Sequence, residues 1–343
     1  MEIANPPLES MVNMTRKFWQ NKKVLITGHE GFLGSNLTKR LLDYGAKVTG
    51  IDIRTNRRHT ILDKADLKRI NTIKGSIENY KLVRDILHQN KIEFIFHLAA
   101  QAIVGKSLKY PSRTFSTNIK GTWNILEASR GDSRIKSIVI ASSDKAYGIH
   151  SLLPYREDAS LAGCYPYDVS KSCADLLAHT YSHTYNLPVC VTRCGNIYGP
   201  GDFHFSRIVP DAVKSALQNK TLIIRSNGKY TRDYIYVEDV LDGYFCLAEK
   251  MQTFGILGQA FNFSDESPLT VIELVSAIYR LANRKPDYKI LNLARCEIEH
   301  QYLSAAKARK LLGWEASHTL KEGLRETIAW YKKYFNSDFQ GNS

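Results

Sequence analysis

The sequence has few cysteines, and their spacing does not suggest a metal site or a disulfide framework. The 343 residues contain six cysteines, with no Cys-x-x-Cys pair and no histidine-rich segment at a suitable spacing. This arrangement argues against both zinc binding and disulfide bonding. We therefore expect no bound metal and reduced, mostly buried thiols. The cysteines are Cys164, Cys173, Cys190, Cys194, Cys246 and Cys296.

Long apolar runs are also missing. No segment approaches the roughly 18 uninterrupted apolar residues that a membrane span requires. Residues 1–20 have an acidic residue, Glu2, near their start and lack the apolar centre of a signal peptide. We found no internal repeat and no low-complexity segment. The sequence therefore predicts a loose tail over residues 1–20 and a cytoplasmic protein that does not bind membranes.

The composition is that of a globular protein with a basic charge balance. Hydrophobic residues make up 43% and charged residues 24% of the chain, which excludes a disordered chain, a coiled coil and a collagen-like repeat. Lysine and arginine total 47 against 34 acidic residues, a formal charge of +13. No basic run with interleaved aromatic residues accompanies this charge. We therefore expect small anionic ligands and no nucleic-acid partner.

Short apolar runs alternate with helical segments in the first half of the chain. The runs are nearly continuous in hydrophobicity, as in parallel strands that are covered on both faces. Between the first two runs, Leu33, Leu37 and Leu41 form one stripe of a helix. This alternation predicts an α/β fold with a doubly wound parallel sheet and a smaller C-terminal lobe. The runs cover residues 24–27, 48–53, 92–97, 138–141 and 189–192.

A glycine-rich turn follows the first predicted strand. Gly28, Gly31 and Gly34 allow a pyrophosphate to approach the backbone at the start of a helix. Asp52 lies 18 residues after Gly34, at the end of the second strand, where it can bind a ribose diol. Its carboxylate favours NAD over NADP. A basic segment leaves NADP open as the less favoured cofactor; it contains Arg54, Arg57 and Arg58.

Three further motifs follow the glycine turn in order: HLAAQ at 97–101, TNIKGT at 117–122 and YDVSK at 167–171. Together they resemble the extended short-chain dehydrogenase/reductases, which act on nucleotide-diphosphate sugars, over residues 18–334. The resemblance implies a Rossmann NAD-binding domain at 21–192, with a return segment at about 232–262. A substrate-binding lobe would comprise 193–231 and 263–343. The implied cofactor-binding residues are Gly28, Glu30, Gly31, Phe32, Leu33, Gly34, Asp52, Ile53, Ser76, Ile77, Leu98, Ala99, Ala100, Asn118, Tyr167 and Lys171.

Tyr167 and Lys171 are candidates for the oxidation chemistry. Four residues apart on a helix, they project from one face. A free tyrosine has a pKa of about 10, which is too high for a base near neutral pH. We expect the Lys171 ammonium and a positively charged nicotinamide to lower the pKa of Tyr167.

Ser143, Asp144 and Lys145 follow the fourth run, at the carboxyl edge of the predicted sheet. This triplet resembles that of CDP-glucose 4,6-dehydratases within the family. After C4 of the sugar is oxidised, the C5 proton becomes acidic and the C6 hydroxyl must leave. The resemblance implies that Asp144 acts as the acid, Lys145 as the base and Ser143 as a hydrogen-bond donor to the 4-oxygen. Lys145 can serve only if its surroundings keep it neutral.

The same resemblance implies a nucleotide-diphosphate sugar as substrate and a homodimer formed through residues 117–130 and 167–185. Gln101, Asn196, Arg207 and Arg232 are the implied substrate contacts, with Arg232 on the diphosphate. Ser76 stands where the family usually has an aspartate, which leaves the nucleobase and the sugar of the substrate open.

Two alternative functions remain. One is a nucleotide-sugar 4-epimerase, which needs Tyr167 and Lys171 only, and the other is a non-catalytic RNA-binding or scaffold protein of the same fold.

Overall fold

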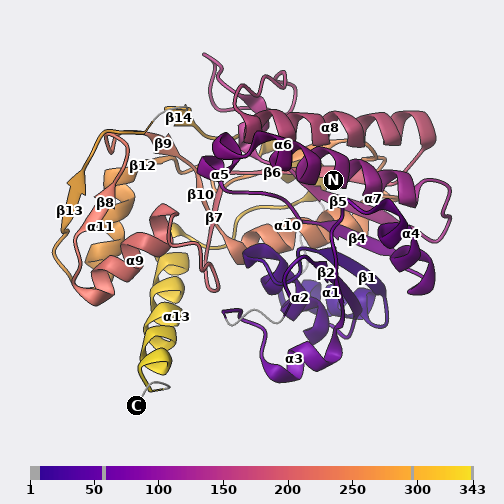
Figure 1. The fold of residues 1–343 in the computed structure, drawn as a ribbon, viewed down its shortest axis with the longest axis horizontal. Coiled ribbons are helices and arrows are strands. Elements are labelled where there is room, and N and C mark those ends of the chain that lie inside the picture. Colours follow the sequence, from indigo (N-terminus) through magenta and orange to yellow (C-terminus); the bar gives the residue numbers. More distant parts are fainter. Residues whose placement is uncertain (1–7, 56–58, 295–296, 341–343) are drawn as a thin grey trace. The chain divides into compact units, whose positions relative to one another are not determined.

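The protein is built on a seven-stranded sheet in the order β11-β6-β5-β4-β1-β2-β3. This computed structural model describes residues 8–55, 59–294 and 297–340. The pairs β1–β2, β1–β4, β2–β3 and β4–β5 are parallel, which confirms the predicted doubly wound sheet (Figure 1). The strands are β1 (Lys23–Thr27), β2 (Lys47–Asp52), β3 (Asn71–Lys74), β4 (Phe94–His97), β5 (Ser137–Ala141), β6 (Val189–Cys194) and β11 (Ala260–Phe263).

The five predicted apolar runs correspond to β1, β2, β4, β5 and β6. The strands β3 and β11 were not predicted from the sequence. β3 has the sequence NTIK, and its first and last residues are exposed, so it is neither continuously apolar nor alternating. β11 contains Asn262, a polar residue that is fully buried. Neither strand has the pattern of a covered parallel strand.

Helices connect the strands of this sheet. Of the predicted apolar stripe on α2, Leu37 and Leu41 are fully buried, whereas Leu33 is only partly buried. The helices are α1 (Leu8–Trp19), α2 (Phe32–Asp43), α3 (Lys64–Arg69), α4 (Tyr80–Gln89), α5 (Val104–Lys109), α6 (Pro111–Phe115), the π-helix η1 (Ser116–Lys120), α7 (Gly121–Ser129), α8 (Pro166–Tyr185) and α10 (Val237–Lys250).

The prediction of a loose tail is wrong for residues 8–19, which form helix α1. Trp19 at its end is fully buried, with its ring centroid 4.9 Å from that of Phe94 and 5.5 Å from that of Phe245. Its indole Nε1 donates to Glu249 Oε1 at 2.6 Å. These aromatic contacts and the satisfied indole anchor the helix.

The chain divides into two compact units. The first comprises the described residues up to Ala141 with 173–191 and 244–259, and the second comprises 142–172, 192–243 and the described residues from 260 onward. Residues 142–172, predicted to belong to the NAD-binding domain, pack within the second unit. Its further elements are η2 (Asp144–Tyr147), β7 (Asn196–Tyr198), α9 (Ile208–Gln218), β8 (Leu222–Ile224), β9 (Thr231–Arg232), β10 (Tyr234–Tyr236), β12 (Leu269–Thr270), α11 (Val271–Leu281), β13 (Tyr288–Ile290), β14 (His300–Gln301), α12 (Ala306–Leu312) and α13 (Leu320–Gln340).

The five described cysteines differ in burial, and Cys296 lies outside the described residues. Cys190 and Cys194 are buried whereas Cys164 is exposed, so the expected burial holds for only part of the set. Within the described residues, no helix is both long and apolar enough to cross a bilayer. The predicted dimer helices α7 and α8 carry the exposed side chains of Trp123 and Leu176. The homodimer itself stays a prediction.

Candidate active site

The glycine turn after β1 lies in the first unit and has room only for glycine at two positions. Gly28 has a φ of +73°, and a Cβ there would lie 3.1 Å from the backbone of Ala99. A Cβ on Gly34 would lie 2.1 Å from the Gly28 carbonyl oxygen. The turn therefore presents bare backbone at the start of α2, as the sequence predicts.

Two side chains hold the loop that follows β4. Thr27 Oγ1 accepts hydrogen bonds from the backbone N–H groups of Leu98 and Ala99, each at 3.0 Å. The Asn118 amide accepts from the Gln101 N–H at 2.7 Å and donates to the Gln101 carbonyl at 3.2 Å. Asn118 lies in the π-helix η1, a rare local geometry that is frequent at functional sites. The structure therefore brings the predicted loop 98–101 and Asn118 together.

Asp52 ends β2 and is buried, with 6% of its surface exposed. Its Oδ1 accepts a hydrogen bond from the backbone N–H of Arg54 at 3.1 Å. The side chains of Ile53 and Arg54 are exposed, and Arg57 and Arg58 lie outside the described residues. The carboxylate at this position agrees with the predicted preference for NAD.

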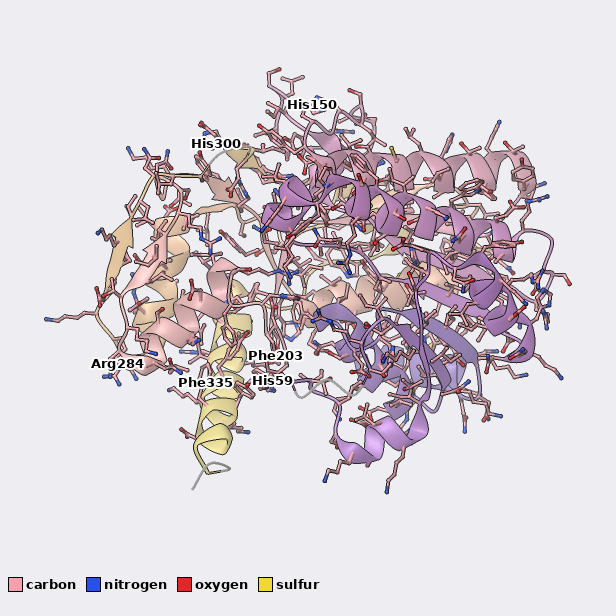
Figure 2. The ribbon with its side chains drawn as sticks, viewed as in Figure 1. His59, His150, Phe203, Arg284, His300 and Phe335 are labelled. Atoms are coloured by element: carbon pink, nitrogen blue, oxygen red, sulfur yellow. The ribbon has the colours of Figure 1, made fainter. Side chains whose placement is uncertain are left out.

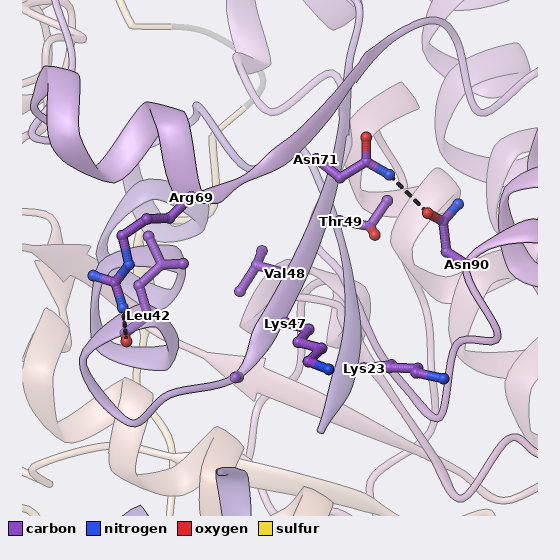
Figure 3. A pocket seen from close by; sticks show the side chains of 9 residues that line it. Lys23, Leu42, Lys47, Val48, Thr49, Arg69, Asn71 and Asn90 are labelled. Atoms are coloured by element: carbon purple, nitrogen blue, oxygen red, sulfur yellow. Dashed lines mark hydrogen bonds between the residues drawn. The ribbon is translucent and has the colours of Figure 1, made fainter. Parts of the chain in front are cut away.

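A cavity of about 330 Å³ lies at the amino ends of β1 and β2, away from the carboxyl ends where the glycine turn and Asp52 lie (Figure 3). Lys23 and Lys47, the first residues of β1 and β2, line it together with Asn71, whose amide donates to Asn90 Oδ1 at 2.7 Å. Ligands of doubly wound sheets bind at the carboxyl ends of the strands. This cavity is therefore not the predicted cofactor site.

Ser143 and Asp144 begin the second unit's cluster of reactive groups, just after β5. The Ser143 hydroxyl donates to Asp144 Oδ1 at 2.9 Å and accepts from the Lys145 N–H at 3.3 Å, which caps η2. Asp144 is only 3% exposed. Burial raises the pKa of its carboxyl, against the opposing effect of the Lys145 charge. The environment thus favours the neutral acid, which can donate a proton.

Lys145 is partly buried, and its Nζ donates to Gln301 Oε1 at 3.1 Å. Burial lowers the pKa of its ammonium, and the nearby Arg232 charge lowers it further, whereas Asp144 and Asp168 oppose this shift. The neutral amine, which can accept a proton, is therefore more accessible than in a free lysine. Both pKa shifts have the direction that an acid and a base would need, and the two roles stay predictions.

Tyr167 and Lys171 lie in the first turns of α8, as predicted, and both are buried. The Lys171 Nζ is 5.8 Å from the centroid of the Tyr167 ring. Burial raises the pKa of Tyr167 to about 12 and the Asp144 charge adds to the shift, whereas Arg207 and a hydrogen bond with Ser143 oppose it. In the protein without NAD the pKa thus shifts upward, because burial outweighs the Arg207 charge and the Ser143 hydrogen bond. The predicted lowering includes the charge of the nicotinamide and stays a prediction for the complex with NAD.

Sequence reasoning missed Asp168 and Gln301 as members of this cluster. Asp168 is 2% exposed, and burial raises the pKa of its carboxyl to about 6, against the effect of Lys145. Gln301 is fully buried and lies 156 residues from Lys145 in the sequence. The position of Asp168 beside Tyr167 was a usable signal, but nothing in the sequence links Gln301 to Lys145.

The predicted substrate arginines make contacts within the second unit. Arg207 Nη1 donates to Asp202 Oδ2 at 3.0 Å. Arg232 is buried, and its guanidinium donates to the carbonyls of Thr231 and Glu299 at 2.9 Å and to that of Ile298. Gln101 belongs to the first unit, and Asn196 begins β7 in the second. Their contacts with a substrate stay predictions.

Residues 24–262 match the family model described as the NAD dependent epimerase/dehydratase family. The chain belongs to this family. It is 31% identical to the CDP-glucose 4,6-dehydratase of Salmonella typhimurium over 342 residues, 94% of either chain. It is 30% identical to the UDP-glucuronate 4-epimerase of Thermodesulfobacterium geofontis over 322 residues, 90% of this chain and 96% of that one. Both dehydratases and epimerases are therefore among the relatives of this family member.

A similar solved structure is the dTDP-glucose 4,6-dehydratase of Bacillus anthracis in complex with NAD. It has a TM-score of 0.80 and 28% identity, and the match covers 91% of this chain and 97% of that chain. NAD is the cofactor of the family. The bare backbone of the glycine turn and the buried Asp52 carboxylate fit its pyrophosphate and ribose.

Replacement of Gly34 with alanine is expected to weaken NAD binding at least about tenfold, because the new methyl group overlaps the Gly28 carbonyl and forces the turn apart. Calorimetric titration with NAD measures the effect. Gly105→Ala is the control, because a Cβ at Gly105 meets no atom within 4 Å. Equal NAD affinity of Gly34→Ala and the unchanged protein would contradict the assignment of the turn.

Proposed function

We propose that the protein is an NAD-dependent nucleotide-sugar 4,6-dehydratase that converts a CDP-glucose-like substrate to its 4-keto-6-deoxy form. The observation that supports this most is the adjacent pair Asp144 and Lys145, whose pKa values shift toward the neutral forms. A 4-epimerase changes only the configuration at C4 and has no need of a second acid and base. Loss of water across C5 and C6 needs both.

The first step is the oxidation of C4 to a ketone, in which the hydroxyl group at C4 and the carbon itself each lose a hydrogen. When bound, NAD supplies the two-electron acceptor for C4 and later the donor for C6. Tyr167 accepts the hydroxyl proton, and Ser143 holds the 4-oxygen. The pKa of about 12 for Tyr167 includes repulsion from an ionised Asp144, so protonation of Asp144 makes the phenol a stronger acid. Lys171 lies on the same helix and orients the ribose of the cofactor.

The second step is the elimination of water. The C4 ketone makes the C5–H bond acidic, and the Lys145 amine takes that proton. The electron pair of this bond forms the C5=C6 double bond as the C6–O bond breaks, and Asp144 gives its proton to the leaving oxygen. C6 regains a hydride, which is two electrons with their proton, and the Lys145 ammonium returns a proton to C5. Exchange with solvent then removes the proton that Tyr167 accepted and restores the one that Asp144 gave. The net change is the loss of one water with no net use of the cofactor.

The choice of a CDP-linked sugar rests on resemblance. The Salmonella typhimurium relative is named for CDP-glucose, and the Ser-Asp-Lys triplet agrees with that type. Asp52 and Ser76 depart from the pattern of that type, so the test of the function compares four nucleobases. Asn196, Arg207 and Arg232 are proposed to contact the nucleotide diphosphate.

A panel of CDP-, GDP-, UDP- and dTDP-sugars tests the function. The protein with NAD is incubated with each sugar, and the products are analysed by mass spectrometry. We expect one sugar to lose the mass of one water and to give a 4-keto product. A product of unchanged mass and inverted C4 would identify an epimerase instead. Salt-sensitive RNA binding without NAD binding would favour a non-catalytic role.

A further inference from the structure

Gln301 is fully buried and contacts Lys145 within the second unit. It lies on the short strand β14, in register with Arg232 of β9. The Arg232 guanidinium donates to the carbonyls of Ile298 and Glu299, which precede β14. The adjacent His300 is exposed (Figure 2), whereas Gln301 is completely buried. The pairing of β14 with β9 thus fixes the backbone position of Gln301.

The contact with Lys145 determines which way the Gln301 amide faces. When Lys145 is protonated, its ammonium can only donate hydrogen bonds, so Oε1 faces Nζ, 3.1 Å away. The neutral amine keeps this contact by donating one of its two N–H groups. The amide nitrogen Nε2 then points elsewhere, and it has no hydrogen-bond partner among the described residues. A buried donor without an acceptor is costly, and such groups are rare in native structures. An acceptor from a ligand would satisfy it.

We propose that Gln301 is a positioning residue for the dehydration: Oε1 holds the Lys145 amine, and Nε2 donates to an oxygen of the bound sugar. The inference rests on the proposed function, because it takes Lys145 as the base for the C5 proton. It links the base to the substrate through one rigid amide. Sugar hydroxyl and keto oxygens are the acceptors that suit such a donor.

A neutral amide suits this position better than a carboxylate. The charged groups around Lys145 are Asp144, Asp168, Glu297 and Arg232. The three acids favour the ammonium, and Arg232 and burial favour the amine. Gln301 orients the nitrogen without adding a fourth negative charge. A glutamate here would favour the ammonium and remove the donor for the sugar.

The test is Gln301→Glu, with the whole protein and NAD. The rate of dehydration depends on the neutral amine, so the acidic limb of its pH profile should move to higher pH. A shift of one unit lowers the rate about tenfold at a pH below that limb. Gln252→Glu is the matched control, since it makes the same change at an exposed glutamine. Overlapping profiles for Gln301→Glu and the unchanged protein would overturn the proposal.

Two further measurements separate this inference from the proposed function. The pH dependence of Lys145 acylation, followed by peptide mass spectrometry, reports the pKa of its amine without any substrate. Gln301→Glu should raise the pKa of the Lys145 amine. If the pKa rises but no sugar loses water, the proposed function is refuted while the contact between Gln301 and Lys145 is supported. Gln301→Met keeps the size and removes both hydrogen bonds. It should raise KM and lower kcat, and unchanged constants would refute the positioning role.

Discussion

Replacement of Lys145 with methionine is expected to slow water loss from the sugar by about 10²–10⁴-fold, because the base for the C5 proton is removed. Exchange of the C5 hydrogen with deuterated water should fall by the same factor, since it depends on the same proton transfer. Substrate affinity should stay within about twofold, because the lost interaction acts on the reaction and not on binding. Mass spectrometry measures exchange and water loss in one sample.

Methionine is a suitable replacement because it keeps the length and apolar stem of lysine. It leaves Gln301 Oε1 without the hydrogen bond from Nζ, which costs about 1–3 kcal/mol for a buried acceptor. Lys136→Met is the control, because Lys136 makes an exposed ion pair with Glu93 of the kind that contributes little. A thermal melt identifies any loss of folded protein. Normal C5 exchange in a folded Lys145→Met variant would rule out Lys145 as the base.

The sheet was predictable where its strands are apolar on both faces. β1, β2, β4, β5 and β6 are continuous hydrophobic runs, and the glycine turn identifies where the first of them ends. β3 was not predictable, because it is a short strand with polar residues at both ends. Helix α1 was missed for another reason: Trp19 anchors it through contacts with Phe94 and Phe245, which are distant in sequence.

The active-site residues were predictable to the extent that they are close in sequence. Ser143, Asp144 and Lys145 are consecutive, and Tyr167 and Lys171 share a helix turn, so motifs revealed both groups. Their electrostatic state was not predictable, because it depends on burial. Burial raises the pKa of Tyr167 in the protein without NAD, and the sequence gives no measure of that burial. No motif could identify Gln301, because only the fold places β14 next to Lys145.

The net charge of +13 is now only partly explained. Arg207 and Arg232 have acidic or carbonyl partners inside the second unit, and Lys145 and Lys171 belong to the proposed chemistry. These cations act at short range on Tyr167, Asp144 and their neighbours. Lys171 and Arg232 are buried, so neither adds to the charge of the exposed surface.

Replacement of Asp144 with asparagine is expected to leave C5 exchange intact while water loss falls by about 10²–10⁴-fold, because the group that protonates the leaving oxygen is removed. Asparagine keeps the oxygen that accepts from the Ser143 hydroxyl, so the local structure should persist. C5 exchange without water loss would distinguish the role of the acid from that of the base, since Lys145→Met is expected to lose both C5 exchange and water loss. Full water loss by Asp144→Asn would refute the assignment of Asp144 as the acid.

The pH profile gives an independent check on Asp144. Its carboxyl must be protonated to act, and burial raises its pKa, so the rate of water loss should fall as the pH rises through that raised value. Lys145 must be neutral, and burial lowers its pKa, so the rate should rise as the pH rises through the lowered value. Because the two groups interact, the apparent pKa values of the two limbs describe the pair and not either residue alone. Asp144→Asn should abolish the basic limb of the remaining activity and keep the acidic one; a basic limb that persists in this variant would assign it to another group, such as Asp168.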